Sequence, residues 1–373
     1  MSALFIRFGA FDVKPTRWIS KFSIRHSFVF CLKARPRKGN DFIVNFYDRI
    51  LRPTLFNLPA EAAHNLAIAG LRVTPGALLR AIFGKTPFKP VKVFGIEFPN
   101  PVGLAAGMDK NAAALSAWQS LGFGFIEAGT ITALPQPGNP KPRCFRYPEQ
   151  AALINRMGFN NRGASAAAKR LRRLKSWHLW PRIPVGINLG KSKLTPLENA
   201  ASDYATSYSL LLPYGDYFVI NVSSPNTPGL RALQDRDSLS EIIRTLKRIS
   251  AAKPLLVKIA PDLSNEALQE IAGLAEAEGL AGLIATNTTL DHSCIAPGED
   301  QTGGLSGAPL RNRSTEAIRI LRSVTKLPII ASGGIVDSQS AREKLDAGAN
   351  LIQIYTGFVY RGPELIREIV TAL

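Results

Sequence analysis

Cysteine and histidine are scarce in this 373-residue chain, with three of the first and four of the second. The cysteines, Cys31, Cys144 and Cys294, lie far apart and form no Cys-x-x-Cys pair. That spacing argues against a disulfide framework and against a structural zinc site. The histidines are isolated and no acidic cluster accompanies them, so we predict no metal site.

Residues 1–40 also lack a long apolar run, since none there approaches the roughly 18 residues that a membrane-spanning helix needs. Acidic residues are almost missing from residues 1–40, where Asp12 stands against nine Lys and Arg. This segment has neither the apolar core nor the cleavage site of a secretory signal. Its composition is typical of a mitochondrial transit peptide, but we favour the simpler alternative of a poorly ordered basic extension.

The net charge is +18, from 46 Lys and Arg against 28 Asp and Glu. Residues 1–89 hold 15 basic and 4 acidic residues, whereas residues 90–373 hold 31 and 24. The chain is 46% hydrophobic, which is an ordinary globular composition able to bury a core. The basic excess therefore lies on a folded protein, and most of it lies in the first quarter.

Residues 41–89 place apolar side chains at helical spacing, as where Phe42, Phe46 and Ile50 can share one face. Residues 66–73 are apolar almost all round and too short to span a bilayer, so they must be buried in protein or in a membrane interface. We predict a small helical domain here. It is either a cap on the main domain or an interfacial anchor whose Lys and Arg meet anionic lipid.

From residue 101 onward, short apolar segments alternate with longer segments of helical periodicity, which is typical of repeated βα units and a parallel sheet. Eight such strands in about 270 residues predict an α/β fold, a TIM barrel, over residues 90–373. The helical segments are 112–121, 164–175, 239–251, 265–278, 315–324 and 341–347. The expected strands are Val102–Ala105, Phe123–Ala128, Val185–Leu189, Tyr217–Val222, Leu255–Ile259, Gly282–Ala285, Pro328–Ala331 and Leu351–Tyr355.

Each expected strand has a polar residue or a glycine at its C-terminal end or shortly after it. In a barrel these ends converge on one face, where such enzymes place their chemistry. After the last two strands, the glycines near Ser332 and Thr356 fit a phosphate site. The strand-end residues are Lys110, Thr130, Asn188, Asn221, Lys258, Asn287, Gly334 and Thr356.

Two segments are too rich in amides for ordinary turns. Residues 221–229 read NVSSPNTPG directly after the fourth strand, and residues 155–161 read NRMGFNN after the second. Prolines and glycines fix the backbone, while Asn and Ser side chains offer donors and acceptors to a small polar ligand. We therefore expect both segments to contribute to a binding site.

With these motifs the sequence resembles the membrane-associated, quinone-dependent (class 2) dihydroorotate dehydrogenases of pyrimidine (UMP) biosynthesis. The resemblance runs from about Phe46 to the C-terminus. Besides the two amide-rich segments it rests on residues 103–110 (GLAAGMDK), 129–130 (GT), 135–139 (PQPGN), 257–262 (VKIAPD), 285–289 (ATNTT), 303–307 (GGLSG) and 353–357 (QIYTG).

The resemblance implies an FMN flavoprotein that oxidises dihydroorotate to orotate and passes electrons to a quinone, ubiquinone or menaquinone. It implies Ser224 as the catalytic base. The FMN ligands would be Ala106, Gly107, Lys110, Thr130, Asn188, Asn221, Lys258, Thr286, Gly307, Gly334, Tyr355 and Thr356. Orotate would be bound by Lys110, Asn155, Arg156, Met157, Gly158, Phe159, Asn221, Asn226, Asn287 and Thr288.

These roles are chemically reasonable. Removal of a proton from carbon 5 needs a base, and a serine hydroxyl is a poor one unless its surroundings relay the proton away. Lys258 is suited to stabilise negative charge on a reduced flavin. Lys110 and the donors of residues 155–159 are suited to the carboxylate of the substrate.

Two features favour the quinone-dependent subclass. Soluble members of the family carry a cysteine as the base, where this chain has Ser224, and they lack the N-terminal helices. His64 and Arg146 match residues at the quinone tunnel of the membrane-associated members. Because residues 1–40 lack a transmembrane anchor, we expect a monomeric peripheral protein on the cytoplasmic side of a bacterial inner membrane, with the mitochondrial inner membrane as the alternative.

Two alternatives belong to other functional classes. A nucleic-acid-acting flavin barrel, such as a tRNA-dihydrouridine synthase, would explain the high charge through phosphate contacts. It would require a catalytic cysteine and a basic barrel mouth, so we expect no nucleic-acid partner. A non-catalytic membrane-binding scaffold would leave the polar strand ends without a purpose.

Overall fold

The computed structural model describes residues 46–373, which belong to one compact unit. The extension predicted over residues 1–40, and Phe42 in the first predicted helix, lie outside the described residues. The division of the chain at residues 40 and 89 therefore stays a prediction.

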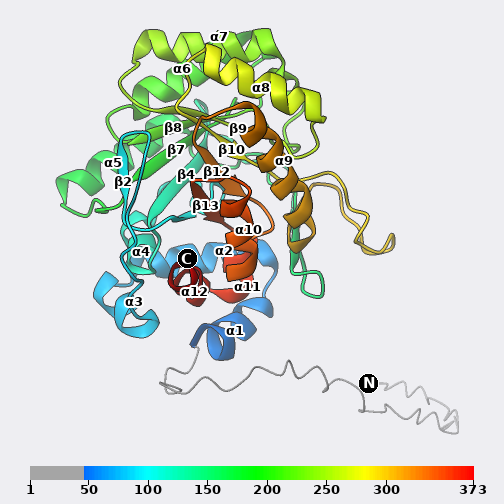
Figure 1. The fold of residues 1–373 in the computed structure, drawn as a ribbon. Coiled ribbons are helices and arrows are strands. Elements are labelled where there is room, and N and C mark those ends of the chain that lie inside the picture. Colours follow the sequence, from blue (N-terminus) through cyan, green and yellow to red (C-terminus); the bar gives the residue numbers. More distant parts are fainter. Residues whose placement is uncertain (1–45) are drawn as a thin grey trace, which may run out of the picture. The chain divides into compact units, whose positions relative to one another are not determined.

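Eight parallel strands close into a barrel, as the sequence predicted (Figure 1). Around the barrel the strand order is β10, β12, β13, β3, β4, β7, β8 and β9, which is the order of the chain. Strands β5 and β6, between β4 and β7, and β11, between β10 and β12, lie outside the barrel. Three of the predicted ranges are reproduced residue for residue, and the others differ by one to three residues at an end. The strands are β3 (Val102–Leu104), β4 (Phe125–Ile131), β7 (Val185–Leu189), β8 (Tyr217–Asn221), β9 (Leu255–Ile259), β10 (Gly282–Ala285), β12 (Ile329–Ser332) and β13 (Leu351–Ile354).

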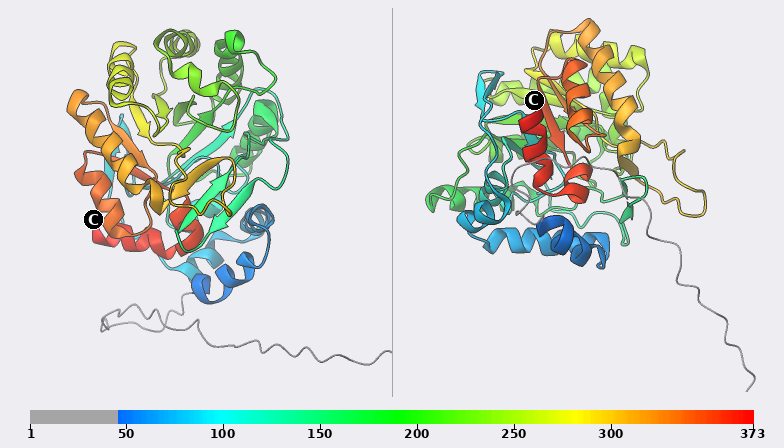
Figure 2. Two further views of the ribbon diagram at one scale, coloured as in Figure 1. Left: turned by 90° about the vertical axis from the view of Figure 1, so that its right-hand side faces the viewer. Right: turned by 60° about the horizontal axis from the view of Figure 1, so that its bottom comes forward.

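Helices lie around the outside of this barrel (Figures 1 and 2). The prediction of a helix over residues 112–121 was too long, because the Asp109 carboxylate accepts hydrogen bonds from the backbone N–H of Ala113 and Ala114 and delays its start. The helices are α4 (Leu115–Ser120), α5 (Gly163–Ser176), α6 (Ala200–Leu211), α7 (Arg236–Ile249), α8 (Asn265–Ala277), α9 (Arg311–Val324), α10 (Ser338–Asp346), α11 (Thr356–Arg361) and α12 (Glu364–Ala372).

The amino-terminal end of the barrel is closed by aromatic side chains. A short antiparallel hairpin, β1 (Val91–Val93) and β2 (Ile96–Phe98), places Phe98 against Phe125 with ring centroids 5.2 Å apart. Room for such rings comes from glycine: a Cβ atom on Gly186 would lie 2.1 Å from the ring of Tyr217. A ligand can therefore be accommodated only toward the carboxyl ends of the strands.

A second small sheet, which the sequence did not predict, lies over that carboxyl end. It consists of β5 (Cys144–Tyr147), β6 (Ala152–Asn155) and β11 (Gly304–Gly307), all antiparallel. Asn155 is paired with both Cys144 and Gly304 in this sheet. The sheet thus fixes the amide-rich segment that begins at Asn155.

The N-terminal segments η1 (Tyr47–Leu51), α1 (Arg52–Phe56), α2 (Ala60–Val73) and α3 (Gly76–Phe83) pack beside α11 and α12 (Figures 1 and 2). The Tyr47 hydroxyl donates to the carbonyl of Val359 at 2.6 Å, and Arg52 donates to that of Tyr360 at 2.8 Å. Glu61 forms an ion pair with Arg143 at 2.8 Å. These contacts attach the helices to the barrel.

The outer side of these helices exposes apolar side chains. Leu66, Val73 and Leu78 are 55%, 81% and 50% exposed. Over residues 46–373 no single helix has both the length and the apolar character to cross a membrane. Helices α2 and α3 meet that criterion only as a pair, which is bent by 115°.

Candidate active site

A cavity opens at the carboxyl ends of the barrel strands, and the strand-end residues predicted from the sequence lie in its wall. Every predicted site residue lines it except Asn188, Arg156 and Arg146. The lining residues among those predicted are Ala106, Gly107, Lys110, Thr130, Asn221, Lys258, Thr286, Gly307, Gly334, Tyr355 and Thr356, together with Asn155, Met157, Gly158, Phe159, Ser224, Asn226, Asn287, Thr288 and His64.

Asn188 lies directly behind the wall and orients two residues that form it. Its Oδ1 atom accepts hydrogen bonds from the Thr130 hydroxyl at 2.5 Å and from Nδ2 of Asn221 at 3.0 Å. All three side chains are buried and come from neighbouring strands. Their orientation is therefore fixed by the barrel before any ligand binds.

A buried carboxylate that the sequence reasoning missed lies under this group. Glu127 on β4 is fully buried and accepts a hydrogen bond from Nδ2 of Asn188 at 2.7 Å and another from Nε2 of Gln353. Its Oε1 atom lies 3.9 Å from Nζ of Lys258. The available signal was a lone acidic residue inside the otherwise apolar strand FIEAGTI.

Two lysines bring positive charge to the cavity. Lys110 and Lys258 are 9% and 4% exposed, and neither ammonium donates a hydrogen bond to any group in residues 46–373. Burial lowers the pKa of Lys110 to about 8, although Cys144 and Glu61 act in the opposite direction. Glu127 compensates the charge of Lys258 only from 3.9 Å, and among residues 46–373 Lys110 has no such close carboxylate. Buried ammonium groups without hydrogen-bond acceptors are costly, so this wall of the cavity is suited to anionic ligands.

The backbone is close to the cavity where β12 and β11 end. Gly333, Gly334 and Gly307 line it with φ angles of 105°, 71° and 103°, which other residues rarely adopt. A Cβ atom on Gly334 would lie 2.2 Å from the Cα atom of Arg311. Backbone of this kind can approach a phosphate closely, as the sequence suggested.

The polar side chains opposite form the second part of the cavity. Nδ2 of Asn226 donates to Oδ1 of Asn155 at 3.3 Å, and Nδ2 of Asn287 donates to the Ser223 hydroxyl at 3.0 Å. The Thr288 hydroxyl is buried without a hydrogen-bond partner in the part of the chain that the structure describes. An unpaired buried hydroxyl beside a cavity is explained most simply by a polar ligand.

Ser224 lies in this part of the cavity and is 6% exposed. Its Oγ atom accepts a hydrogen bond from the backbone N–H of Asn226 at 3.3 Å. Within the described residues no His, Asp or Glu side chain is hydrogen-bonded to it. The serine is therefore positioned by its own loop and not by a triad.

Arg156 differs from its neighbours in the NRMGFNN segment. Its guanidinium donates to the carbonyl of Thr302 at 3.1 Å and lies over the ring of Phe145, 4.7 Å from the centroid. Its backbone N–H donates to the carbonyl of Arg143 at 2.9 Å. The side chain thus fixes the segment from outside the cavity.

Helix α2 contributes Glu61 and His64 to the cavity wall. Burial and the charge of Lys110 lower the pKa of His64 to about 3, so the imidazole is neutral at pH 7. Burial alone would raise the pKa of Glu61, but the hydrogen bonds and charge of Arg143 lower it below its usual value. One side of α2 is therefore part of the site.

Arg146 lies behind this region and connects it to the N-terminal helices. It donates hydrogen bonds to the carbonyls of Leu55 and Leu58, and its guanidinium lies over the Phe56 ring, 4.5 Å from the centroid. The residue holds the turn before α2. It therefore places His64 without lining the cavity itself.

Comparison with known proteins agrees with this geometry. The family model described as dihydroorotate dehydrogenase matches residues 89–373. Proteins named dihydroorotate dehydrogenase (quinone) from Salinispora arenicola and Thermus thermophilus are 53% and 51% identical, over 87% and 86% of this chain and 98% and 94% of their own.

Solved structures give the same result. The crystal structure of DHODH from Eimeria tenella in complex with ferulenol is 39% identical, with a TM-score of 0.77 over 84% of this chain and 90% of its own. These likenesses confirm the predicted barrel and the predicted resemblance to the quinone-dependent enzymes. The chain belongs to the dihydroorotate dehydrogenase family.

Proposed function

We propose that the cavity holds FMN and dihydroorotate side by side, and that quinone reaches it past α2 from a membrane surface. The overall reaction is that of the family: dihydroorotate is oxidised to orotate, a step of pyrimidine biosynthesis, with a quinone as electron acceptor.

The observation that carries the proposal is the pair of buried lysines at one cavity. Neither Lys110 nor Lys258 donates a hydrogen bond within residues 46–373, and the one carboxylate paired with Lys258 is Glu127, 3.9 Å away. The same wall holds glycines with open backbone. A phosphate and a carboxylate would supply the missing acceptors. FMN and dihydroorotate carry one such group each.

The donor set suits FMN. The Thr288 hydroxyl is buried without a partner within the described residues, and it lines a region that also contains amides. Gly334 and Thr356 would hold the phosphate. Lys258 would hold the ring system together with Thr130 and Asn221, which Asn188 orients. When bound, FMN supplies the acceptor for the hydride that leaves carbon 6 of the substrate.

Ser224 is proposed to take the proton from carbon 5. Its loop holds it close to Asn226, and Asn155, Asn226 and Asn287 would orient the planar substrate through its carbonyl and N–H groups. Lys110 would bind the carboxylate. Burial of these groups excludes water from the reacting carbons.

The quinone, as electron acceptor, would reach the protein at α2 and α3. Their exposed Leu66, Val73 and Leu78 fit the apolar layer of a membrane interface, while Glu61 and the neutral His64 lie at the cavity. We place the enzyme as a peripheral, monomeric protein on an anionic membrane surface. The bacterial inner membrane is preferred, and the mitochondrial inner membrane is the alternative.

The first test concerns the cofactor and the acceptor. The purified protein should be yellow from one FMN per chain, should bleach with dihydroorotate, and should be reoxidised by a ubiquinone analogue faster than by fumarate or NAD. Absorbance at the flavin band in a stopped-flow instrument measures each step. Absence of flavin contradicts the cofactor assignment, and faster reoxidation by fumarate contradicts the acceptor.

The second test concerns the base. Ser224→Ala should retain FMN and substrate but slow flavin reduction by about 100-fold to 10,000-fold, which is the usual contribution of a positioned base. Ser224→Cys is the matched variant, because a thiolate can also accept the proton, and it should retain part of the rate. Unchanged reduction in Ser224→Ala would remove Ser224 from this role.

The third test uses pH. Because burial disfavours the charged form, Lys110 carries its proton below a pKa of about 8 and loses it above that pH. The KM for dihydroorotate should therefore rise about tenfold per pH unit above this value. In Lys110→Arg, whose side chain stays charged, KM should be flat from pH 7 to 10. A flat KM in the parent enzyme would argue against Lys110 as the carboxylate ligand.

The fourth test concerns the membrane. Val73→Glu and Leu78→Glu should each weaken co-flotation with phosphatidylglycerol vesicles by about tenfold, because each removes one apolar side chain from the interface. Turnover with a short-chain soluble quinone should persist. Val324→Glu, on an exposed position of α9, is the control. Equal vesicle binding by all three variants would contradict the assigned surface.

A further inference from the structure

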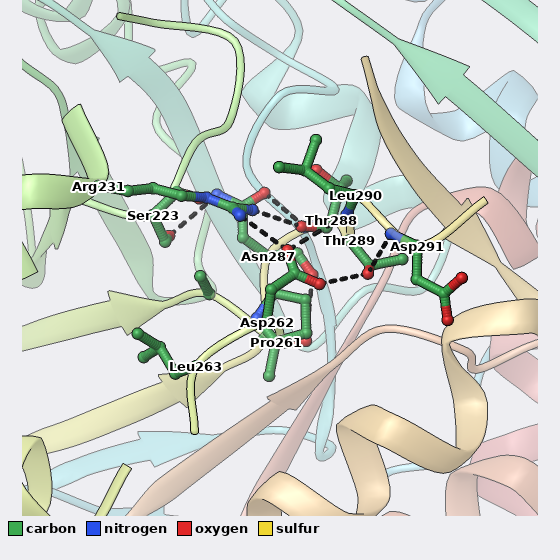
Figure 3. Close-up of polar contacts among 12 residues, drawn as sticks. Ser223, Arg231, Pro261, Asp262, Leu263, Asn287, Thr288, Thr289, Leu290 and Asp291 are labelled. Carbon is green, nitrogen blue, oxygen red and sulfur yellow. Dashed lines mark hydrogen bonds and ion pairs between the residues drawn. The ribbon is translucent and has the colours of Figure 1, made fainter. Parts of the chain in front are cut away.

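Arg231 lies just after the loop that carries Ser224 and donates hydrogen bonds in three directions (Figure 3). Its Nε atom donates to the carbonyl of Ser223 at 3.0 Å, and Nη2 donates to the carbonyl of Thr288, also at 3.0 Å. Nη1 forms an ion pair with Asp262 at 2.7 Å. One guanidinium thus joins the segments that follow β8, β9 and β10.

Asp262 extends this connection on the other side. Its carboxylate accepts hydrogen bonds from the hydroxyl of Thr289 and, at 3.2 Å, from the backbone N–H of Leu290 (Figure 3). Both donors belong to the segment that Arg231 already holds through Thr288. The arginine and the aspartate therefore hold the same segment at two points.

The two carbonyls that Arg231 holds are close to the reacting groups. Ser223 precedes Ser224, and Thr288 itself lines the cavity with a buried hydroxyl that has no partner within the described residues. Between them, Nδ2 of Asn287 donates to the Ser223 hydroxyl at 3.0 Å. A displacement of Arg231 would therefore move the base and the substrate-binding segment relative to each other.

We infer that Arg231 is a positioning residue of the reaction, which fixes the distance between Ser224 and the segment 287–288 and is itself oriented by Asp262. This inference rests on the proposed function. Arg231 does not line the cavity and so is not a catalytic residue. Its contribution is geometric, because displacing a reacting group by about 1 Å can slow a reaction on the order of 100-fold.

The geometry requires arginine. The planar guanidinium presents donors in a rigid fork that reaches three acceptors at once, whereas an ammonium is a single point on a flexible stem. The side chains of Arg231 and Asp262 are 22% and 26% exposed, so their ion pair is partly screened by solvent. Substitution of either residue should therefore slow the reaction more strongly than it lowers the stability of the fold.

The test separates the two half-reactions in the FMN-loaded enzyme. In Arg231→Met, flavin reduction at saturating dihydroorotate should be slowed about 100-fold. Reoxidation by a soluble ubiquinone analogue should keep its parent rate, because the acceptor side does not depend on this loop. FMN content is measured in the same samples.

Three further variants sharpen the result. Arg231→Lys should restore only part of the reduction rate, and Asp262→Asn should slow reduction less than Arg231→Met does. The double variant should be no slower than Arg231→Met, since both residues act in one unit. Arg244→Met is the matched control, because Arg244 forms a similar ion pair with Glu278 at 2.6 Å on the surface and should change neither half-reaction.

The outcomes are distinct. If the parent enzyme is not reduced by dihydroorotate, the proposed function fails and the role of Arg231 fails with it. If the parent is reduced and Arg231→Met is reduced at the same rate, only the positioning role is refuted. Equal slowing of both half-reactions together with loss of FMN would also refute it, since this is the pattern of a structural defect.

Discussion

The polar wall of the cavity depends on one carboxylate, Glu127, buried inside an otherwise apolar barrel. Glu127 is fully buried, and the cost of its charge is offset because Asn188 and Gln353 donate to it while Lys258 lies 3.9 Å away. These partners come from different strands, so the charge is compensated only when the barrel is closed in its correct register. The orientation of the polar wall, including Thr130 and Asn221, follows from the same group.

The barrel strands could be predicted because they are buried on both faces and therefore appear as continuous apolar runs. Even there, β4 extends to Ile131, beyond the predicted end, because its last residues are buried although two are Gly and Thr. The strands β5, β6 and β11 were missed. They are short, and the pairing of β6 with β11 joins residues about 150 positions apart, which no local pattern reveals.

The site residues likewise divide into those that the sequence pattern reveals and those that depend on long-range contacts. Residues at strand ends were found because topology alone brings them together, and the described cavity does contain nearly all of them. Glu127 and Arg231 were not found, since one lies within a strand and the other acts on backbone carbonyls of distant segments. Arg156 and Arg146 were found by motif, but their side chains bind backbone outside the cavity. A motif identifies a position and not the direction of its side chain.

Helix α2 has two sets of side chains with separate surroundings. Glu61 and His64 lie at the cavity, whereas Leu66 and Val73 are exposed on the outer side. Under the proposed function, substitutions on the outer side could adapt the protein to lipids of different composition without altering the groups that would meet the acceptor. Lipid preference and quinone preference would then be free to diverge independently among relatives.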